Sequence, residues 1–68
     1  MAQIVWDTWL DDAERIAREQ PAPCVYVSGR ERPGKTLVCA TQGEADGWVR
    51  DINTRSGNSD AARIVQPH

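Results

Sequence analysis

The sequence has no phenylalanine, only two cysteines and a single histidine, which is its last residue. A structural zinc site needs four closed ligands, and the cysteines and the terminal histidine are too few to form one. No internal histidine is present to act as a general base, and neither cysteine has an obvious activating partner. We therefore expect a protein that is not an enzyme and that has no catalytic residues, no metal and no cofactor.

Long apolar runs and a strong excess of one charge are also missing. No stretch approaches the roughly 18 consecutive apolar residues of a membrane span, and the N-terminus lacks the basic region of a secretory signal. The formal net charge is only −2, unlike the basic balance of most nucleic-acid-binding domains. We expect a cytoplasmic protein with no membrane partner and no small-molecule substrate, in which Cys24 and Cys39 are buried, reduced thiols.

The 68 residues that are present suffice for one small domain. Leucine, isoleucine and valine together number 12, which is few for a hydrophobic core. Three tryptophans and one tyrosine add apolar bulk to it. The composition therefore predicts a single domain over residues 1–68, and we expect it to be a monomer.

The N-terminal third predicts a short strand followed by a helix. Residues 4–6 are β-prone, and apolar side chains recur at helical spacing over 9–17. Asp7 or Thr8 is expected to cap this helix, which should end near residue 20 because prolines follow. The apolar stripe can also be continued backwards to residue 5, so a helix in place of a strand at 3–7 stays open.

The remainder of the chain predicts a hairpin, a second helix and a last strand. Strands are expected over 24–27 and 36–40, joined by a loop with Pro-Gly turn chemistry. Thr41 and Glu44 match a capping box, and the apolar residues of the helix that follows share one face. A short strand over 62–65 completes the pattern.

The predicted order of elements is β-α-β-β-α-β, or α-β-β-α-β if the first strand is absent. The fuller order is the split βαβ pattern of ferredoxin-like folds. Either order defines an α+β domain. We expect two amphipathic helices that pack on one face of a small antiparallel sheet.

Residues 29–36 match G-x-x-x-x-G-K-[ST] at every fixed position, so this segment resembles the Walker A loop of P-loop NTPases. A P-loop must open a helix whose N-terminal amides hold the phosphate. The residues that follow here are β-branched and apolar without helical spacing. We therefore expect a hairpin tip, in which Arg30, Arg32 and Lys35 remain candidate phosphate contacts.

Acidic residues gather around the start of the first predicted helix: Asp7, Asp11, Asp12 and Glu14. One interpretation is that they stabilise the positive end of the helix macrodipole. The other is a carboxylate surface that imitates phosphates, beside which Trp9 would anchor a partner.

A tiny, mildly acidic chain with this acidic helix start resembles the small inhibitor proteins of bacteriophages and other mobile elements, including anti-CRISPR proteins. The resemblance implies a protein that imitates DNA with these four carboxylates and Trp9. It would bind a host protein or ribonucleoprotein in the host cytoplasm and block the access of nucleic acid. One alternative is a nucleic-acid-binding or regulatory domain that uses the basic tip at 29–36 and stacks bases on Tyr26. Another is an assembly module that pairs through an exposed sheet edge.

Overall fold

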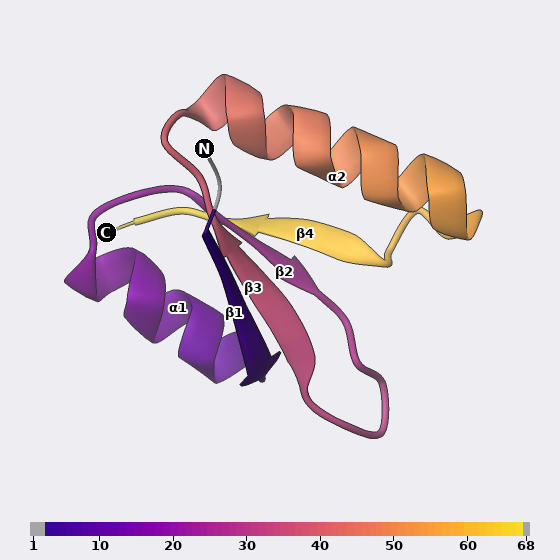
Figure 1. Cartoon of the computed structure of the whole chain (residues 1–68), viewed down its shortest axis with the longest axis horizontal. Coiled ribbons are helices and arrows are strands. Elements are labelled where there is room, and N and C mark those ends of the chain that lie inside the picture. Colours follow the sequence, from indigo (N-terminus) through magenta and orange to yellow (C-terminus); the bar gives the residue numbers. More distant parts are fainter. Residues whose placement is uncertain (1–2, 68) are drawn as a thin grey trace.

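The computed structural model describes residues 3–67. Figure 1 shows the observed elements, which lie in the following order along the chain: β1 (Gln3–Thr8), α1 (Leu10–Glu19), β2 (Cys24–Val27), β3 (Gly34–Val38), α2 (Gln42–Ser56) and β4 (Ala62–Val65). The α+β class and the β-α-β-β-α-β order are thus confirmed. Residues 3–7 lie in a strand, so the alternative of a helix there is wrong.

The four strands form one antiparallel sheet in the order β1-β3-β2-β4. The β2–β3 hairpin occupies its centre, and β1 and β4 are its two edges. The strand β4 pairs with β2 and not with β1. The spatial order therefore differs from that of a ferredoxin-like sheet, in which the last strand lies beside the first.

The two helices lie on opposite faces of this sheet. Successive residues of β2 point to opposite sides: Cys24 and Tyr26 pack with α1, whereas Val25 packs with Ala45 of α2. In Figure 1 the sheet runs between α2 above and α1 below. The prediction that both helices pack on one face is therefore wrong.

Chirality explains the opposite placement. The β1–α1–β2 and β3–α2–β4 connections cross the sheet in the same direction, but β1 and β3 run antiparallel to each other. Because crossover connections are right-handed, reversing the strand direction moves the helix to the other face. A β4 beside β1 would have kept both helices on one face.

The two faces are covered unequally. The helix α1 packs against all four strands, whereas α2 lies over β2 and β4 only. On the α2 face this leaves β1 without a helix above it, and Ile4 and Trp6 are exposed there. Two of the exposed large apolar side chains of the described residues, Ile4 and Trp6, therefore lie on this uncovered margin.

The helix ends follow the capping rules, with one correction. The N-cap of α1 is Trp9, so the prediction of Asp7 or Thr8 as its cap is wrong. Because β1 continues to Thr8, the Trp9 N–H is capped from within the helix, by the Asp12 carboxylate at 2.7 Å. The predicted cap of α2 is confirmed, since Thr41 Oγ1 accepts a hydrogen bond from the Glu44 N–H at 3.2 Å.

The two cysteines are free and buried, as the sequence predicted. They belong to opposite faces of the sheet, Cys24 to the α1 face and Cys39 to the α2 face. Burial raises the pKa of the Cys24 thiol. Burial also raises the pKa of the Cys39 thiol, and the negative charge of Glu44 raises it further.

Candidate functional site

Trp6 is the most exposed large apolar side chain of the described residues, at 66% of its surface. It pairs with Lys35 across β1 and β3, so the two side chains project from the same face of the sheet. The Lys35 ammonium lies 4.8 Å from the centre of the indole ring, within the range of a cation–π contact. The contact holds a positive charge against one side of an exposed aromatic surface.

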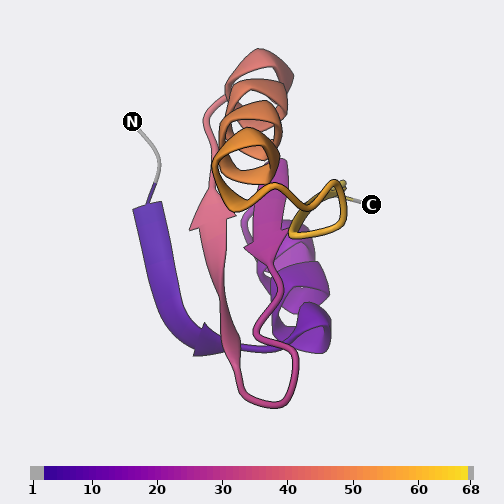
Figure 2. The same cartoon turned by 90° about the vertical axis from the view of Figure 1, so that its right-hand side faces the viewer.

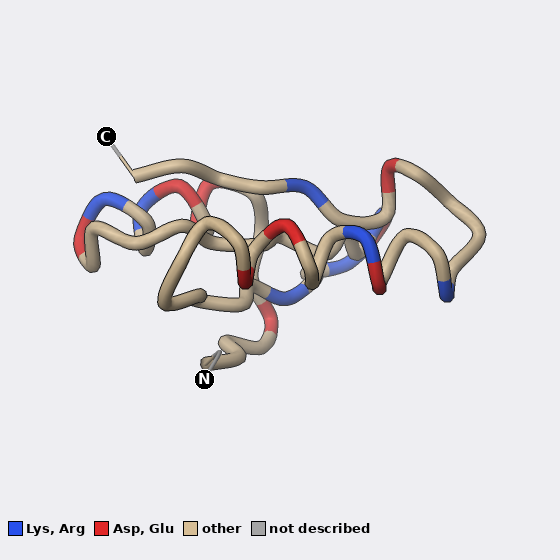
Figure 3. The backbone as a smooth tube through the Cα atoms, turned by 90° about the horizontal axis from the view of Figure 1, so that it is seen from above, with Lys and Arg blue, Asp and Glu red and all other residues tan. Residues whose placement is uncertain are grey.

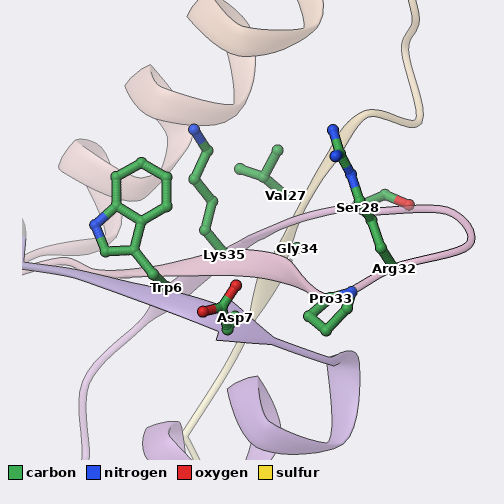
Figure 4. A pocket seen from close by; sticks show the side chains of 9 residues that line it. Trp6, Asp7, Val27, Ser28, Arg32, Pro33, Gly34 and Lys35 are labelled. Carbon is green, nitrogen blue, oxygen red and sulfur yellow. The ribbon is translucent and has the colours of Figure 1, made fainter.

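A hollow of about 310 Å³ opens next to this pair. We call it the Trp6 hollow, and its lining residues are Trp6, Asp7, Val27, Ser28, Gly29, Arg32, Pro33, Gly34 and Lys35. In Figure 4 the side chains of Trp6, Lys35 and Arg32 all rise from the same side of the ribbon. The hollow therefore combines one aromatic surface with two cations.

The β2–β3 loop contains two glycines at the points where its two backbone segments approach each other closely. A Cβ atom at Gly29 would collide with the Arg32 carbonyl, and one at Gly34 would collide with the Val27 carbonyl. The Arg32 N–H also donates to the Gly29 carbonyl at 3.0 Å. The Walker-like spacing of these two glycines is thus explained here by tight packing of a hairpin tip, where only glycine fits.

Backbone strain is concentrated around the same loop. Asp7 and Arg30 have φ angles of 54° and 51°, and among residues 3–67 they are the only non-glycine positions with positive φ. Asp7 lies in a bulge, where the register of β1 against β3 shifts between Trp6 and Thr8. The bulge places Asp7 on the wall of the Trp6 hollow. Such conformations persist where the surrounding structure holds them, which is frequent at binding sites.

The Walker-like segment is part of a hairpin and opens no helix. The residue that would hold a magnesium ion in a P-loop, Thr36, is fully buried. Its Oγ1 lies 2.9 Å from Thr8 Oγ1, on the face opposite to Lys35. The next helix begins only at Gln42. The prediction of a hairpin tip is confirmed, and phosphate contacts by its cations stay a prediction.

The predicted acidic surface is divided between two elements. Asp7 lies in β1 and lines the Trp6 hollow, whereas Asp11, Asp12 and Glu14 lie in α1. The Asp12 carboxylate is engaged within the helix, by the Trp9 N–H and by an ion pair with Arg15 at 3.4 Å. Asp11 and Glu14 are exposed, and Trp9 is 47% exposed.

The predicted basic tip is partly brought together with an aromatic residue. Arg32 and Lys35 line the Trp6 hollow, and Arg30 lines a neighbouring one with Glu31. Tyr26 cannot serve as the stacking residue, because it is only 7% exposed and packs with α1. That expectation was wrong, since the α1 face of the hairpin is the covered face. The sequence did not connect Trp6 with these cations, because only the pairing of β1 with β3 brings Trp6 beside Lys35.

Charges of both signs are mixed and form no long run of one sign. Figure 3 shows blue and red segments interspersed between tan ones, with no long stretch of blue alone or of red alone. Within residues 3–67, no three histidine, cysteine, aspartate or glutamate side chains are grouped as a metal ion would require. None of the described helices is long and apolar enough to cross a membrane.

Comparisons of the chain with family models, with curated proteins and with solved structures found no match. The Trp6 hollow and the surfaces next to it are the features of the described residues that bear on function.

Proposed function

We propose that this protein binds single-stranded nucleic acid, with one base stacked on Trp6. The observation that carries the proposal is the 66% exposed indole of Trp6 beside Lys35, in a hollow that Arg32 also lines. Exposed aromatic side chains next to cations are the usual components of single-strand binding surfaces. An unpaired base offers the flat surface that an indole can stack on, and its phosphates offer the charge.

The charges around the hollow suggest how a strand would lie. Arg32 and Lys35 would contact the phosphates, whereas the Asp7 carboxylate on the other wall repels them. The sugar-phosphate backbone would therefore follow the loop side of the hollow, and the base would lie toward β1. With Arg30, at most three cations take part, so we expect weak binding whose salt slope is no steeper than about −2 for a single strand.

The test is the fluorescence anisotropy of a labelled oligothymidylate titrated with the protein at low salt. Trp6→Ala should weaken binding roughly 5- to 150-fold, because stacking on an aromatic side chain contributes about 1–3 kcal/mol per base. Trp9→Ala is the matched control, since Trp9 is also exposed but does not line the hollow. Equal affinity of the wild type and Trp6→Ala would contradict the proposal.

A second candidate function is the phage-type inhibitor that binds a host nucleic-acid-handling complex. The observation in its favour is that Asp11, Glu14 and Trp9 are all exposed at the start of α1. The experiment is capture of partners from nuclease-treated bacterial lysate by the wild type and by Asp11→Lys/Glu14→Lys. A nuclease-resistant partner that is lost with this variant, and retained with Trp6→Ala, would favour the inhibitor over direct nucleic-acid binding.

A further inference from the structure

The strand β1 is an open edge of the sheet. Among residues 3–67 it pairs only with β3. Figure 2 shows β1 at the left-hand margin of the molecule, with no helix or loop beyond it. The unpaired N–H and C=O groups of such an edge are a template for a further strand.

Before the bulge at Asp7, the composition of β1 offers little protection against such pairing. Residues 3–6 are Gln-Ile-Val-Trp, without a charge, a proline or a glycine. Two of them, Ile4 and Trp6, are 45% and 66% exposed on the α2 face. The other edge, β4, has only four residues, exposes Arg63 and is followed by Pro67, which are the usual means of blunting an edge.

We propose that the strand which covers β1 is β1 of a second copy of this chain, antiparallel and centred on Val5. In this register Ile4 of each copy lies directly opposite Trp6 of the other. Pairs of an aromatic and a β-branched residue are among the favourable cross-strand pairs. The sequence Ile-Val-Trp is thus complementary to itself, and the two sheets would become one continuous sheet.

The charges are compatible with this register. The only charged residue of β1 is Asp7, and it would face Gln3 of the second copy. Lys35 is the neighbour of Trp6 on β3, so the two copies of Lys35 fall on different rows of side chains across the sheet. No like charges are therefore placed opposite each other.

Neighbouring registers lose these advantages. A shift by one residue pairs side chains of opposite faces, and the α2 face of one copy would continue into the α1 face of the other. A register centred on Ile4 leaves Trp6 opposite a residue outside the described range. A register centred on Trp6 places Val5, next to its centre, opposite the bulge at Asp7, where the strand departs from regular pairing. In the proposed register the bulge lies opposite Gln3, at the ends of the paired segment.

Pairing along β1 would also affect the Trp6 hollow. Ile4 of the second copy would lie about 4.5–5.5 Å from Trp6, the spacing of directly opposite residues, and would cover much of its exposed surface. Self-association and nucleic-acid binding should therefore compete for Trp6. This competition rests on the proposed function, whereas the pairing itself does not.

Sedimentation velocity between about 10 μM and 1 mM protein, where weak dimers dissociate, tests the pairing. The wild type should change from monomer to dimer over this range. Ile4→Lys should remain monomeric, because a lysine on an edge strand opposes pairing. Trp9→Ala, which removes an exposed tryptophan outside β1, should dimerise like the wild type. A wild type that is monomeric throughout would overturn the proposal, whatever its affinity for oligonucleotides.

A thiol substitution tests the register and does not depend on the folding of Ile4→Lys. Val5→Cys would bring two thiols face to face at the centre of the pair, within reach of a disulfide. Gln3→Cys is the matched control, because its two copies would lie about four residues apart along the strands. Cys24 and Cys39 are 0% and 2% exposed and should not react.

Under mild oxidation, Val5→Cys should form a covalent dimer at least about tenfold faster than Gln3→Cys, given the steep geometric requirement of a disulfide. Equal or slower cross-linking of Val5→Cys would overturn the proposed register. Oligonucleotide binding by Ile4→Lys then separates the two proposals. If this variant is monomeric and binds no oligonucleotide through Trp6, the nucleic-acid proposal fails and the pairing stands.

Discussion

The two faces of the sheet are built from the same strands, but the helices cover them to different extents. On one face α1 packs against every strand. Tyr26 is buried against α1, and Thr36 is buried on the same face. On the other face α2 lies over β2 and β4, and Trp6 of β1 is left exposed. The comparison shows that an aromatic residue in a strand is buried or exposed according to where the helix crosses, and not according to its own chemistry.

The largest effect should separate these two aromatic residues. Tyr26→Ala removes a buried ring and should reduce the free energy of unfolding by about 3–5 kcal/mol, the usual range for a buried aromatic residue. Trp6→Ala should reduce it by less than about 1 kcal/mol, because its ring is mostly in water already. Urea unfolding of both variants measures the difference. Similar losses for the two would show that the open margin is part of the core.

The next effect concerns the hydroxyl pair on the covered face. Thr36→Val leaves the buried Thr8 hydroxyl without its 2.9 Å partner and should cost about 1–3 kcal/mol. The double variant Thr8→Val/Thr36→Val should recover most of this loss, since no unsatisfied hydroxyl remains. A double-mutant cycle by urea unfolding measures the coupling. Additive losses would mean that the two hydroxyls stabilise the fold independently.

An effect of similar size is expected at the bulge that borders the open margin. Asp7→Gly should keep or raise the free energy of unfolding, because glycine adopts the positive φ of 54° without strain. Asp7→Val should lower it by about 1–3 kcal/mol, the cost of holding a β-branched residue there. Thermal unfolding of the pair gives the sign directly. A valine variant as stable as the glycine variant would argue against a strained bulge.

The smallest effect is a loss of stability at alkaline pH that both faces share. The pKa of Cys24 and of Cys39 is raised by burial, so the folded protein binds their protons more tightly than the unfolded chain does. Their contribution to stability is complete below the ordinary cysteine pKa of 9.0 and is lost as the pH rises through the folded-state pKa. Urea unfolding at neutral and alkaline pH measures it, with Cys24→Ala/Cys39→Ala as the control that should show a weaker decline.

Much of the fold could be predicted from local pattern, and less of the site. The capping pair of Thr41 and Glu44 and the apolar spacing of α2 are local signals, and both predicted their structure. The cap of α1 was misplaced because the strand before it continues to Thr8 and leaves Trp9 in the cap position. The cations Arg32 and Lys35 were recognised as a group, but Trp6 could be joined to them only through the pairing of β1 with β3.

The sequence by itself determined the α+β class, the order of the five elements after β1, the burial of both cysteines and the presence of a hairpin at the Walker-like motif. These properties depend on residues close together in the chain. Only the tertiary structure decided that the helices take opposite faces, that Tyr26 is covered and that Trp6 is open. The reason is that strand β4 lies beside β2, so that right-handed connections from antiparallel strands place α1 and α2 on different sides of the sheet.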